Sequence, residues 1–260
     1  NDFYAYPNID ASLKIIDDVF ILIAGVNGDL EQNSYRNFTQ DNPYVSPTLI
    51  IQQTDKQYRA YIGAKGKLAS NASFNFNVSH TNAVNKPIFI QNSTLTNGAL
   101  AIALAFQAGN SFNVIYDNVK SLDFYGEINI DASKEFNLEA TINYSNFTPE
   151  KEAEVWNMPS FRATASANYN NNSWFAGAKL FYRGTTKDYV VPFGGDIING
   201  QIIENESYID LNINGGYIFS DRLSAFAKIN NALGKNYFSY TNYQVQSLQL
   251  LAGITYKFDL

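Results

Sequence analysis

Few side chains in this chain could carry out acid–base, nucleophilic or metal chemistry. The sequence of 260 residues has one histidine and no cysteine. Without cysteine it can form neither a zinc–thiolate site nor a thiol nucleophile. A serine–histidine hydrolase would need His80, but His80 continues an alternating series with Phe74, Phe76 and Val78. We therefore predict that His80 lies on the apolar side of a strand, and we predict no catalytic residue.

Acidic residues occur in tight turns and in one charged run. Asp17, Asp18 and Asp221 fall at predicted turns, where aspartate is favoured because its side chain bonds to nearby backbone. The run Glu-Lys-Glu-Ala-Glu at 150–154 could bind a cation or the divalent ions of lipopolysaccharide, although such runs are also typical of solvated loops. No P-loop, dinucleotide-binding or zincin motif is present. We predict no metal site and no cofactor.

The overall composition excludes further classes. With 18 Lys and Arg against 24 Asp and Glu, the net charge is −6, so the basic face that nucleic-acid binding needs is missing. Aromatic residues make up 15% of the chain, which argues against disorder. The longest apolar run, at 19–24, is far shorter than the roughly 20 residues of a membrane-spanning helix. The N-terminus has no signal-peptide pattern, so we expect a processed end or a cut inside a longer chain.

The elements that must position any site show a period of two. From 248 to 260, the even positions are apolar and the odd positions are mainly small or polar. The same alternation recurs at 209–219, 174–183, 161–169, 136–145 and 73–79. Since successive strand side chains point to opposite faces, each predicted strand has one apolar and one polar face.

Two folds compete for this pattern, a soluble β-sandwich and a transmembrane β-barrel. The predicted strands have about ten to fourteen residues, against about five or six in most strands. The polar face is rich in Asn, Ser and Thr, as expected of a watery lumen. Aromatic residues stand at both ends of the apolar face, as interfacial girdles do; they are Phe136, Tyr144, Phe161, Tyr169, Trp174 and Tyr182. We predict an all-β, antiparallel transmembrane β-barrel in the bacterial outer membrane.

The connections alternate between short and long. Short turns at 17–18, 69–71, 133–135, 170–172 and 220–222 are expected on the periplasmic side, and long loops at 29–56, 83–120, 148–158, 186–205 and 232–246 outside the cell. About eleven or twelve strands are predicted. They lie near 3–16, 19–28, 57–68, 72–82, 121–132, 136–147, 159–170, 173–185, 206–219, 223–231 and 247–258.

The strand count bears on completeness. Single-chain bacterial barrels have an even number of strands and both ends in the periplasm. Eleven strands ending in the periplasm would begin outside the cell, so we expect missing upstream sequence. A single miscounted strand would restore an even count, and then a complete small barrel of about ten or twelve strands would be the alternative.

The C-terminal residues resemble a known family. Residues 228–237 (Lys-Ile-Asn-Asn-Ala-Leu-Gly-Lys-Asn-Tyr) and 251–258 (Leu-Ala-Gly-Ile-Thr-Tyr-Lys-Phe) are similar to the last hairpin of TonB-dependent outer-membrane receptors. Segments 33–37, 42–47 and 154–161 resemble loop motifs of the same family. Gly253, Tyr256 and Phe258 match its closing strand, which implies recognition by the barrel-assembly machinery. That strand normally ends on the Phe, whereas Asp259 and Leu260 follow here.

The resemblance implies a barrel of about 22 strands filled by an N-terminal plug. Residues 1–260 would then be a single barrel region in outer-membrane lipid, with the plug and the first barrel half absent. The implied function is active uptake of a scarce ligand, such as a metal chelate, vitamin or glycan, driven by TonB through the missing plug. A surface lipoprotein could cover the loops. A complete porin-like passive channel is the alternative, and a barrel enzyme is disfavoured.

Two sets of residues are candidates for the site. Charges predicted to face the lumen would set its electrostatics; they are Glu139, Arg162, Lys179, Arg183, Asp210 and Lys257. Aromatic residues in long loops are candidates for ligand contact, with ordinary loop packing as the alternative; they are Trp156, Tyr189, Tyr240 and Tyr243. Residues 98–109 fit either a strand extension or a short helix.

Overall fold

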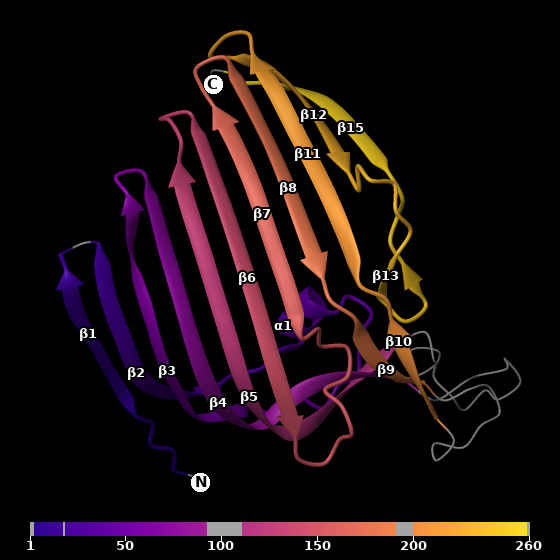
Figure 1. The fold of residues 1–260 in the computed structure, drawn as a ribbon. Coiled ribbons are helices and arrows are strands. Elements are labelled where there is room, and N and C mark those ends of the chain that lie inside the picture. The colour runs from indigo at the N-terminus through magenta and orange to yellow at the C-terminus, as the bar shows by residue number, and fades with distance from the viewer. Residues whose placement is uncertain (1–2, 18, 93–110, 191–199, 259–260) are drawn as a thin grey trace, which may run out of the picture.

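One antiparallel sheet dominates the computed structural model (Figure 1), which describes residues 3–17, 19–92, 111–190 and 200–258. The sheet has eleven strands, which confirms the predicted all-β, antiparallel fold. In spatial order they are β1 (Asn8–Ile16), β2 (Phe20–Glu31), β3 (Thr54–Ala69), β4 (Ala72–Gln91), β5 (Phe112–Asp131), β6 (Phe136–Pro149), β7 (Phe161–Asn170), β8 (Trp174–Arg183), β11 (Tyr208–Ile218), β12 (Leu223–Asn230) and β15 (Gln249–Tyr256).

Short elements occupy three of the segments predicted as long loops. Helix α1 (Tyr35–Asp41) lies between β2 and β3, and Ser34 caps it by accepting a hydrogen bond from the backbone N of Asn37 at 3.1 Å. Strands β9 (Thr186–Val190) and β10 (Gln201–Asn205) form a hairpin between β8 and β11. Strands β13 (Phe238–Tyr240) and β14 (Tyr243–Gln244) form another between β12 and β15. The long loops are therefore partly ordered.

The prediction for the 83–120 segment was wrong at both ends. Strands β4 and β5 have 20 residues each and continue to Gln91 and from Phe112. A register shift between Ala83 and Lys86 interrupts the pairing, which then resumes from Lys86–Asp117 to Gln91–Phe112. Asn85 has a positive φ of 56° at this bulge, so the alternation breaks there although the ladder does not. Residues 98–109 lie outside the described residues.

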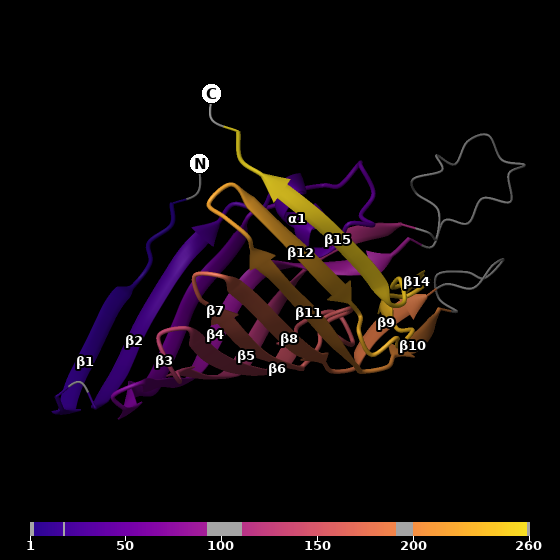
Figure 2. The same ribbon diagram turned by 90° about the horizontal axis from the view of Figure 1, so that it is seen from above.

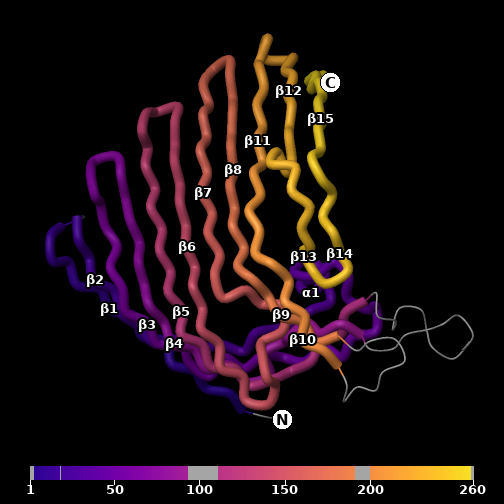
Figure 3. Tube along the Cα trace, turned by 45° about the vertical axis from the view of Figure 1, so that its right-hand side comes forward, coloured from indigo at the N-terminus to yellow at the C-terminus, as the bar shows by residue number. Residues whose placement is uncertain are grey.

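The sheet is curved into a trough (Figures 2 and 3), with α1 on its concave side. Strand β1 pairs with β2 and strand β15 pairs with β12, so these two strands form the edges of the described sheet. Its two margins are not paired with each other in the part of the chain that the structure describes. Over the same residues, no helix combines the length and the apolar character needed to cross a membrane.

The two faces of the sheet differ as the alternation predicts. Residues paired across antiparallel strands share a face, and the register places Asn77, Tyr125, Asn143, Arg162 and Arg183 in one polar row. The row reaches the cavity beside α1 and is therefore concave. The apolar residues alternate with this polar row and lie on the convex face. They are exposed, whereas the core residues of a soluble β-sandwich would be buried; examples are Phe76, Ile142 and Tyr144.

Buried apolar side chains gather where the long loops emerge, which we call the loop end. A first cluster contains Phe38, Val45, Phe112, Val114 and Tyr240. A second cluster contains Ile88, Val119, Val155 and Trp156. Both clusters join the extended ends of β4 and β5 to loop segments, so they hold the loops against the concave side of the sheet.

Candidate functional site

A cavity of about 890 Å³ lies on the concave side at the loop end. Its walls come from α1, the loop-end residues of β3, β4, β7 and β8, and β13. Four basic side chains line it, together with the acids Glu31 and Asp41. We call this cavity the cationic chamber. Its basic residues are Lys56, Lys86, Arg162 and Arg183.

Two arginines form the floor of the chamber. Arg162 on β7 and Arg183 on β8 are register partners, so the strand geometry places both side chains next to each other on the concave face. The Arg183 guanidinium donates to the backbone O of Ser239 at 2.8 Å and of Asn157 at 3.0 Å. Neither arginine is in an ion pair with any of the described residues. The pair is therefore a positive centre with no direct carboxylate partner, although Asp41 lines the same chamber.

The lysines extend this centre to the opposite wall. Lys56 pairs with Glu31 at 3.0 Å. Lys86 comes from the extended part of β4 and forms no ion pair within the described residues. The chamber is thus rich in positive charge in a chain whose net charge is −6. Four cations against two acids leave an excess of positive charge, which attracts ligands of the opposite sign.

Tyr240 connects the chamber to α1. Its hydroxyl donates to the backbone O of Asp41 at 2.8 Å, and the Arg183 guanidinium carbon lies 5.5 Å from its ring centre. Its ring packs edge-on against Phe112 at 5.2 Å. Burial raises the pKa of Tyr240 to about 12, against the opposing effect of Arg183. The phenol therefore stays neutral and keeps its hydrogen bond at physiological pH.

Glu139, Lys179 and Asp210 lie on the same face, and neither they nor Lys257 line the chamber. The register places Glu139, Ser166 and Lys179 in one row farther from the loop end. Asp210 is buried and accepts a hydrogen bond from the Tyr237 hydroxyl. Lys257 follows β15, where its backbone N donates to Arg222 at 2.9 Å. Of the six predicted charges, the structure brings only Arg162 and Arg183 to the chamber.

The loop aromatics are used in different ways. Trp156 is 3% exposed in the second cluster, and its indole N donates to Glu152 at 2.9 Å. Tyr189 lies 5.7 Å from the Trp156 ring, and Tyr243 stacks on Tyr44 at 3.4 Å. Of the four candidates, only Tyr240 borders the chamber. Ligand contact by these residues stays a prediction.

His80 and the proposed assembly signal lie away from the chamber. His80 is on the apolar side of β4, with its ring 6.0 Å from that of Tyr58. Gly253 is paired with Phe226 on β12, whose ring covers the glycine. The exposed rings of Tyr256 and Phe258 meet at 4.8 Å. No group of His, Cys, Asp or Glu that could hold a metal ion occurs among the described residues.

Two basic residues of the chamber, Lys56 and Lys86, were not predicted from the sequence. Lys86 lies in a segment that the sequence predicts as a loop. The bulge before Lys86 interrupts the alternation, so the sequence pattern does not show which face of the sheet Lys86 occupies. Lys56 precedes a second register shift, between Lys56 and Tyr58 on β3. A strand bulge shifts the alternation by one residue, so the period of two cannot assign such residues to a face.

Comparisons with known proteins bear on the fold. No protein-family model and no curated protein matches the sequence. The pyoverdine outer-membrane receptor FpvA from Pseudomonas aeruginosa matches with a TM-score of 0.67 and 13% identity, over 97% of this chain and 36% of that chain. The ferric-catecholate import receptor Fiu from E. coli K12 matches at 0.63 and 11%, over 96% and 34%. The copper transporter OprC matches at 0.62 and 10%, over 96% and 38%.

These matches agree on one fold. The chain spans about a third of the length of the solved structures that it matches. It therefore has the fold of a segment of such receptors, which confirms, at the level of the fold, the resemblance to TonB-dependent receptors. Because the sequence identity is this low, the shared fold does not indicate that this chain binds the ligand of any matched protein.

Proposed function

We propose that this chain forms part of the wall of an outer-membrane receptor that takes up a scarce ligand. Three features support the proposal: an exposed apolar convex face suited to lipid, a polar concave face, and the shared fold. In this proposal the chain is one region of a barrel of about 22 strands. A plug elsewhere in the protein contacts TonB, the barrel-assembly machinery inserts the barrel, and a surface lipoprotein covers the loops.

The cationic chamber is the observation that carries this function. Arg162 and Arg183 are held side by side without a carboxylate partner. Placing two like charges together is unfavourable, and an anionic ligand would reverse that cost. Guanidinium groups match carboxylate and other oxyanion ligands through paired hydrogen bonds. The proposed ligand is therefore an anionic molecule, such as a metal chelate with acidic groups.

The proposed process is transport rather than catalysis. His80, the one histidine, lies on the apolar side of β4, where it cannot meet a ligand in the lumen. Lumen charges such as Glu139, Lys179, Asp210 and Lys257 would contact either the ligand path or the plug. The passive channel alternative differs in one respect, because its solutes would enter cells without TonB.

Binding to the purified receptor that contains this chain tests the anionic ligand. We expect Arg162→Gln to weaken binding of ferric citrate, an anionic chelate, by about tenfold or more in isothermal titration calorimetry. Lys65→Gln is the matched control, since Lys65 is a cation on the concave face of β3 outside the chamber. Binding should weaken as salt is raised. Tighter binding of neutral ferrichrome than of ferric citrate, or equal loss in both variants, would contradict the proposal.

Uptake in cells tests the transport mechanism. We expect radioactive iron supplied as ferric citrate to enter cells that express the receptor, and entry to stop when the tonB gene is deleted. Entry that continues without TonB would instead support a passive channel.

A further inference from the structure

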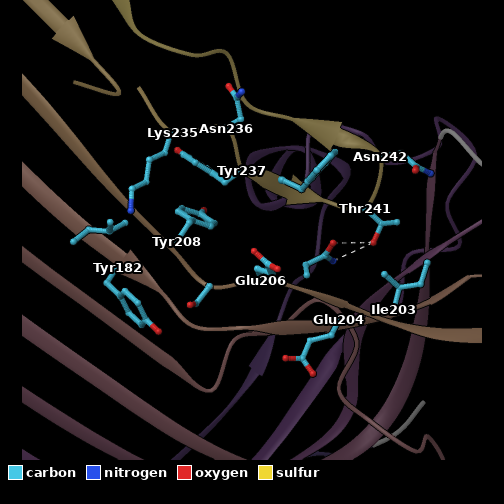
Figure 4. Close-up of a pocket in the computed structure, with 14 residues that line it drawn as sticks. Tyr182, Ile203, Glu204, Glu206, Tyr208, Lys235, Asn236, Tyr237, Thr241 and Asn242 are labelled. Carbon is cyan, nitrogen blue, oxygen red and sulfur yellow. Dashed lines mark hydrogen bonds between the residues drawn. The ribbon is translucent and has the colours of Figure 1, made fainter. Parts of the chain in front are cut away.

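A second cavity, of about 850 Å³, lies beside the first residues of β11 (Figure 4). It exists because β12 is shorter than β11: their pairing ends at Ile213–Ile229, which leaves the segment from Tyr208 to Asn212 without a β12 neighbour. The chain after β12 crosses this gap, where the backbone N of Ala232 donates to Leu211 at 2.7 Å. We call the cavity the tyrosine pocket. It is lined by residues 203–209, residues 235–238, Thr241, Asn242 and Tyr182.

Two stacked tyrosines form a rigid flat surface in this pocket. The Tyr208 and Tyr237 rings lie 3.8 Å apart with an interplanar angle of 14°. The Tyr237 hydroxyl donates to the buried carboxylate of Asp210. This hydrogen bond fixes the position of the Tyr237 ring. Burial, and then the hydrogen bond to Asp210, raise the pKa of Tyr237. The surface is therefore neutral and fixed before any ligand arrives.

Uncommitted hydrogen-bonding groups surround the stacked pair. The side chains of Glu204, Glu206, Asn236 and Asn242 line the pocket, and none of them bonds to another of the described residues. Lys235 lines it as well and forms no ion pair there. The pocket thus offers acceptors, donors and charges of both signs. The chamber, by contrast, is dominated by cations.

We propose that the tyrosine pocket binds a saccharide. The C–H face of a sugar ring is apolar and flat enough to stack on an aromatic ring, while its hydroxyls need several acceptors and donors around the rim. Carboxylates of Glu204 and Glu206 can each accept from two hydroxyls, and the amides can both donate and accept. A volume of about 850 Å³ lies within the range of ligand pockets and leaves room for more than one ring.

The pocket is separate from the proposed uptake site. Ser239 and Tyr240 of the 235–242 segment line the chamber, whereas Tyr237, Phe238 and Thr241 line the pocket. The two cavities share no lining residue, although Tyr208 of the pocket is the register partner of Arg183 of the chamber. The saccharide site goes beyond the proposed function, since it does not depend on an anionic ligand in the chamber.

Two sources could supply the sugar. Tyr182 and Ile209 are register partners on the convex, apolar face, and both border the pocket. The pocket therefore lies at the rim where the apolar face meets the loops. Either a free oligosaccharide or the sugar part of a glycolipid in the surrounding outer leaflet would meet the same side chains.

Calorimetric titration of the whole receptor in detergent separates these sources. The titrants are maltohexaose as a free oligosaccharide, the deacylated core oligosaccharide of lipopolysaccharide as the glycolipid sugar, and spermidine as a cation without sugar. We expect saturable binding of at least one oligosaccharide, and the tighter one identifies the source. No saturable binding of either oligosaccharide, or displacement of the bound sugar by spermidine, would overturn the proposal.

Substitutions then locate the site. We expect Tyr208→Ala to weaken saccharide binding by about tenfold or more, since stacking is lost. Tyr217→Ala is the matched control, because Tyr217 lies at the other end of β11. The double variant Glu204→Gln with Glu206→Gln changes exposed residues, so it should fold even if Tyr208→Ala does not. It should weaken binding several-fold without abolishing it, because amides still bond to hydroxyls.

A third substitution keeps the two sites distinguishable. Arg162→Gln should leave saccharide binding unchanged, because Arg162 does not line the tyrosine pocket. Saccharide binding that is insensitive to Tyr208→Ala and to the double glutamine variant would overturn the assignment to this pocket. Loss of ferric citrate binding in Arg162→Gln would support the proposed uptake site and would leave the saccharide site unaffected.

Discussion

The loop end and the middle of the sheet are built on different principles. At the loop end, the two apolar clusters bury side chains such as Phe112 and Ile88 completely. In the middle of the sheet, large apolar residues on the convex face stay exposed, Phe76 by 43% and Ile142 by 50%. The loop end is thus stabilised by buried apolar packing, as in a soluble protein. The middle of the sheet is stabilised by its backbone hydrogen-bond ladder and by the apolar surroundings of its convex face.

This difference explains where the charges can be held. A guanidinium on a bare strand is free to move, but Arg183 is fixed by the backbone oxygens of Ser239 and Asn157 and by the Tyr240 ring. Those partners belong to loop segments that the two clusters hold in place. The chamber therefore depends on packing at the loop end as much as on the strand register.

The largest expected effect compares the two tryptophans of the chain. Trp156→Ala should lower the local stability of the 148–158 loop by about 4 kcal/mol, since it leaves a cavity in the second cluster. Trp174→Ala, at a convex position that is 55% exposed, should cost far less in detergent. Hydrogen exchange of the two segments measures both values. Equal losses would break the distinction between loop end and middle.

The next effect concerns a glycine midway along the strands, at the β1 edge of the sheet. Asp10 on β1, Gly25 on β2 and Tyr61 on β3 are in register, and the Tyr61 hydroxyl crosses over Gly25 to donate to Asp10 at 2.6 Å. A Cβ on Gly25 would come within 2.7 Å of the Ile9 backbone O. We expect Gly25→Val to destabilise the β1–β2 pairing by about 2 kcal/mol.

Faster hydrogen exchange along β1 would show this loss. Gly215→Ala is the control, because its nearest neighbour would lie at 3.4 Å, an ordinary contact. If both variants exchange like the unsubstituted chain, the edge strand is held by something other than this bridge.

A smaller effect concerns the contact between the chamber and α1. Tyr240→Phe keeps the buried ring but removes the hydrogen bond to Asp41, so the stability of α1 should fall by about 1 kcal/mol. Tyr35→Phe, at an exposed position in the same helix, is the control. Hydrogen exchange at Phe38 and Asn42 reads out both. A change of the same size in the control would mean that Tyr240 does not anchor the helix.

The smallest effect is a pH dependence in the β9–β10 hairpin. Burial raises the pKa of Asp188 above its ordinary value of 3.8, although hydrogen bonds from Thr241 and Asn157 oppose the shift. The opened hairpin loses this proton near the ordinary pKa and the folded hairpin loses it at higher pH. Stability should therefore fall as pH rises between these two values and stay constant above them.

Asp188→Asn tests that sign, because asparagine has no proton to lose. The variant should show no such fall, and at neutral pH its hairpin should open no more readily than that of the unsubstituted chain. Hydrogen exchange of 187–190 across this pH range, corrected for intrinsic exchange rates, is the measurement. A hairpin that becomes more stable as pH rises would contradict the raised pKa.

The strands were predictable because their signal is local. Strand β6 begins at Phe136 and β7 ends at Asn170, as the alternation predicts, and the other predicted strands overlap the observed ones. Side-chain alternation follows from the geometry of an extended chain. It therefore also assigned Glu139, Arg162, Lys179, Arg183 and Asp210 to one face. The sequence by itself thus determined the fold class, the strand positions and the polarity of each face.

Only the tertiary structure decided which of these residues meet. The pairing of Arg162 with Arg183 depends on the β7–β8 register, and the approach of Lys86 depends on a bulge and on the length of β4. Trp156 and Tyr240 could equally have been exposed, and their burial follows from contacts with strands distant in sequence. The tyrosine pocket exists because β12 ends early beside β11. Such contacts join residues far apart along the chain, and a local pattern does not record them.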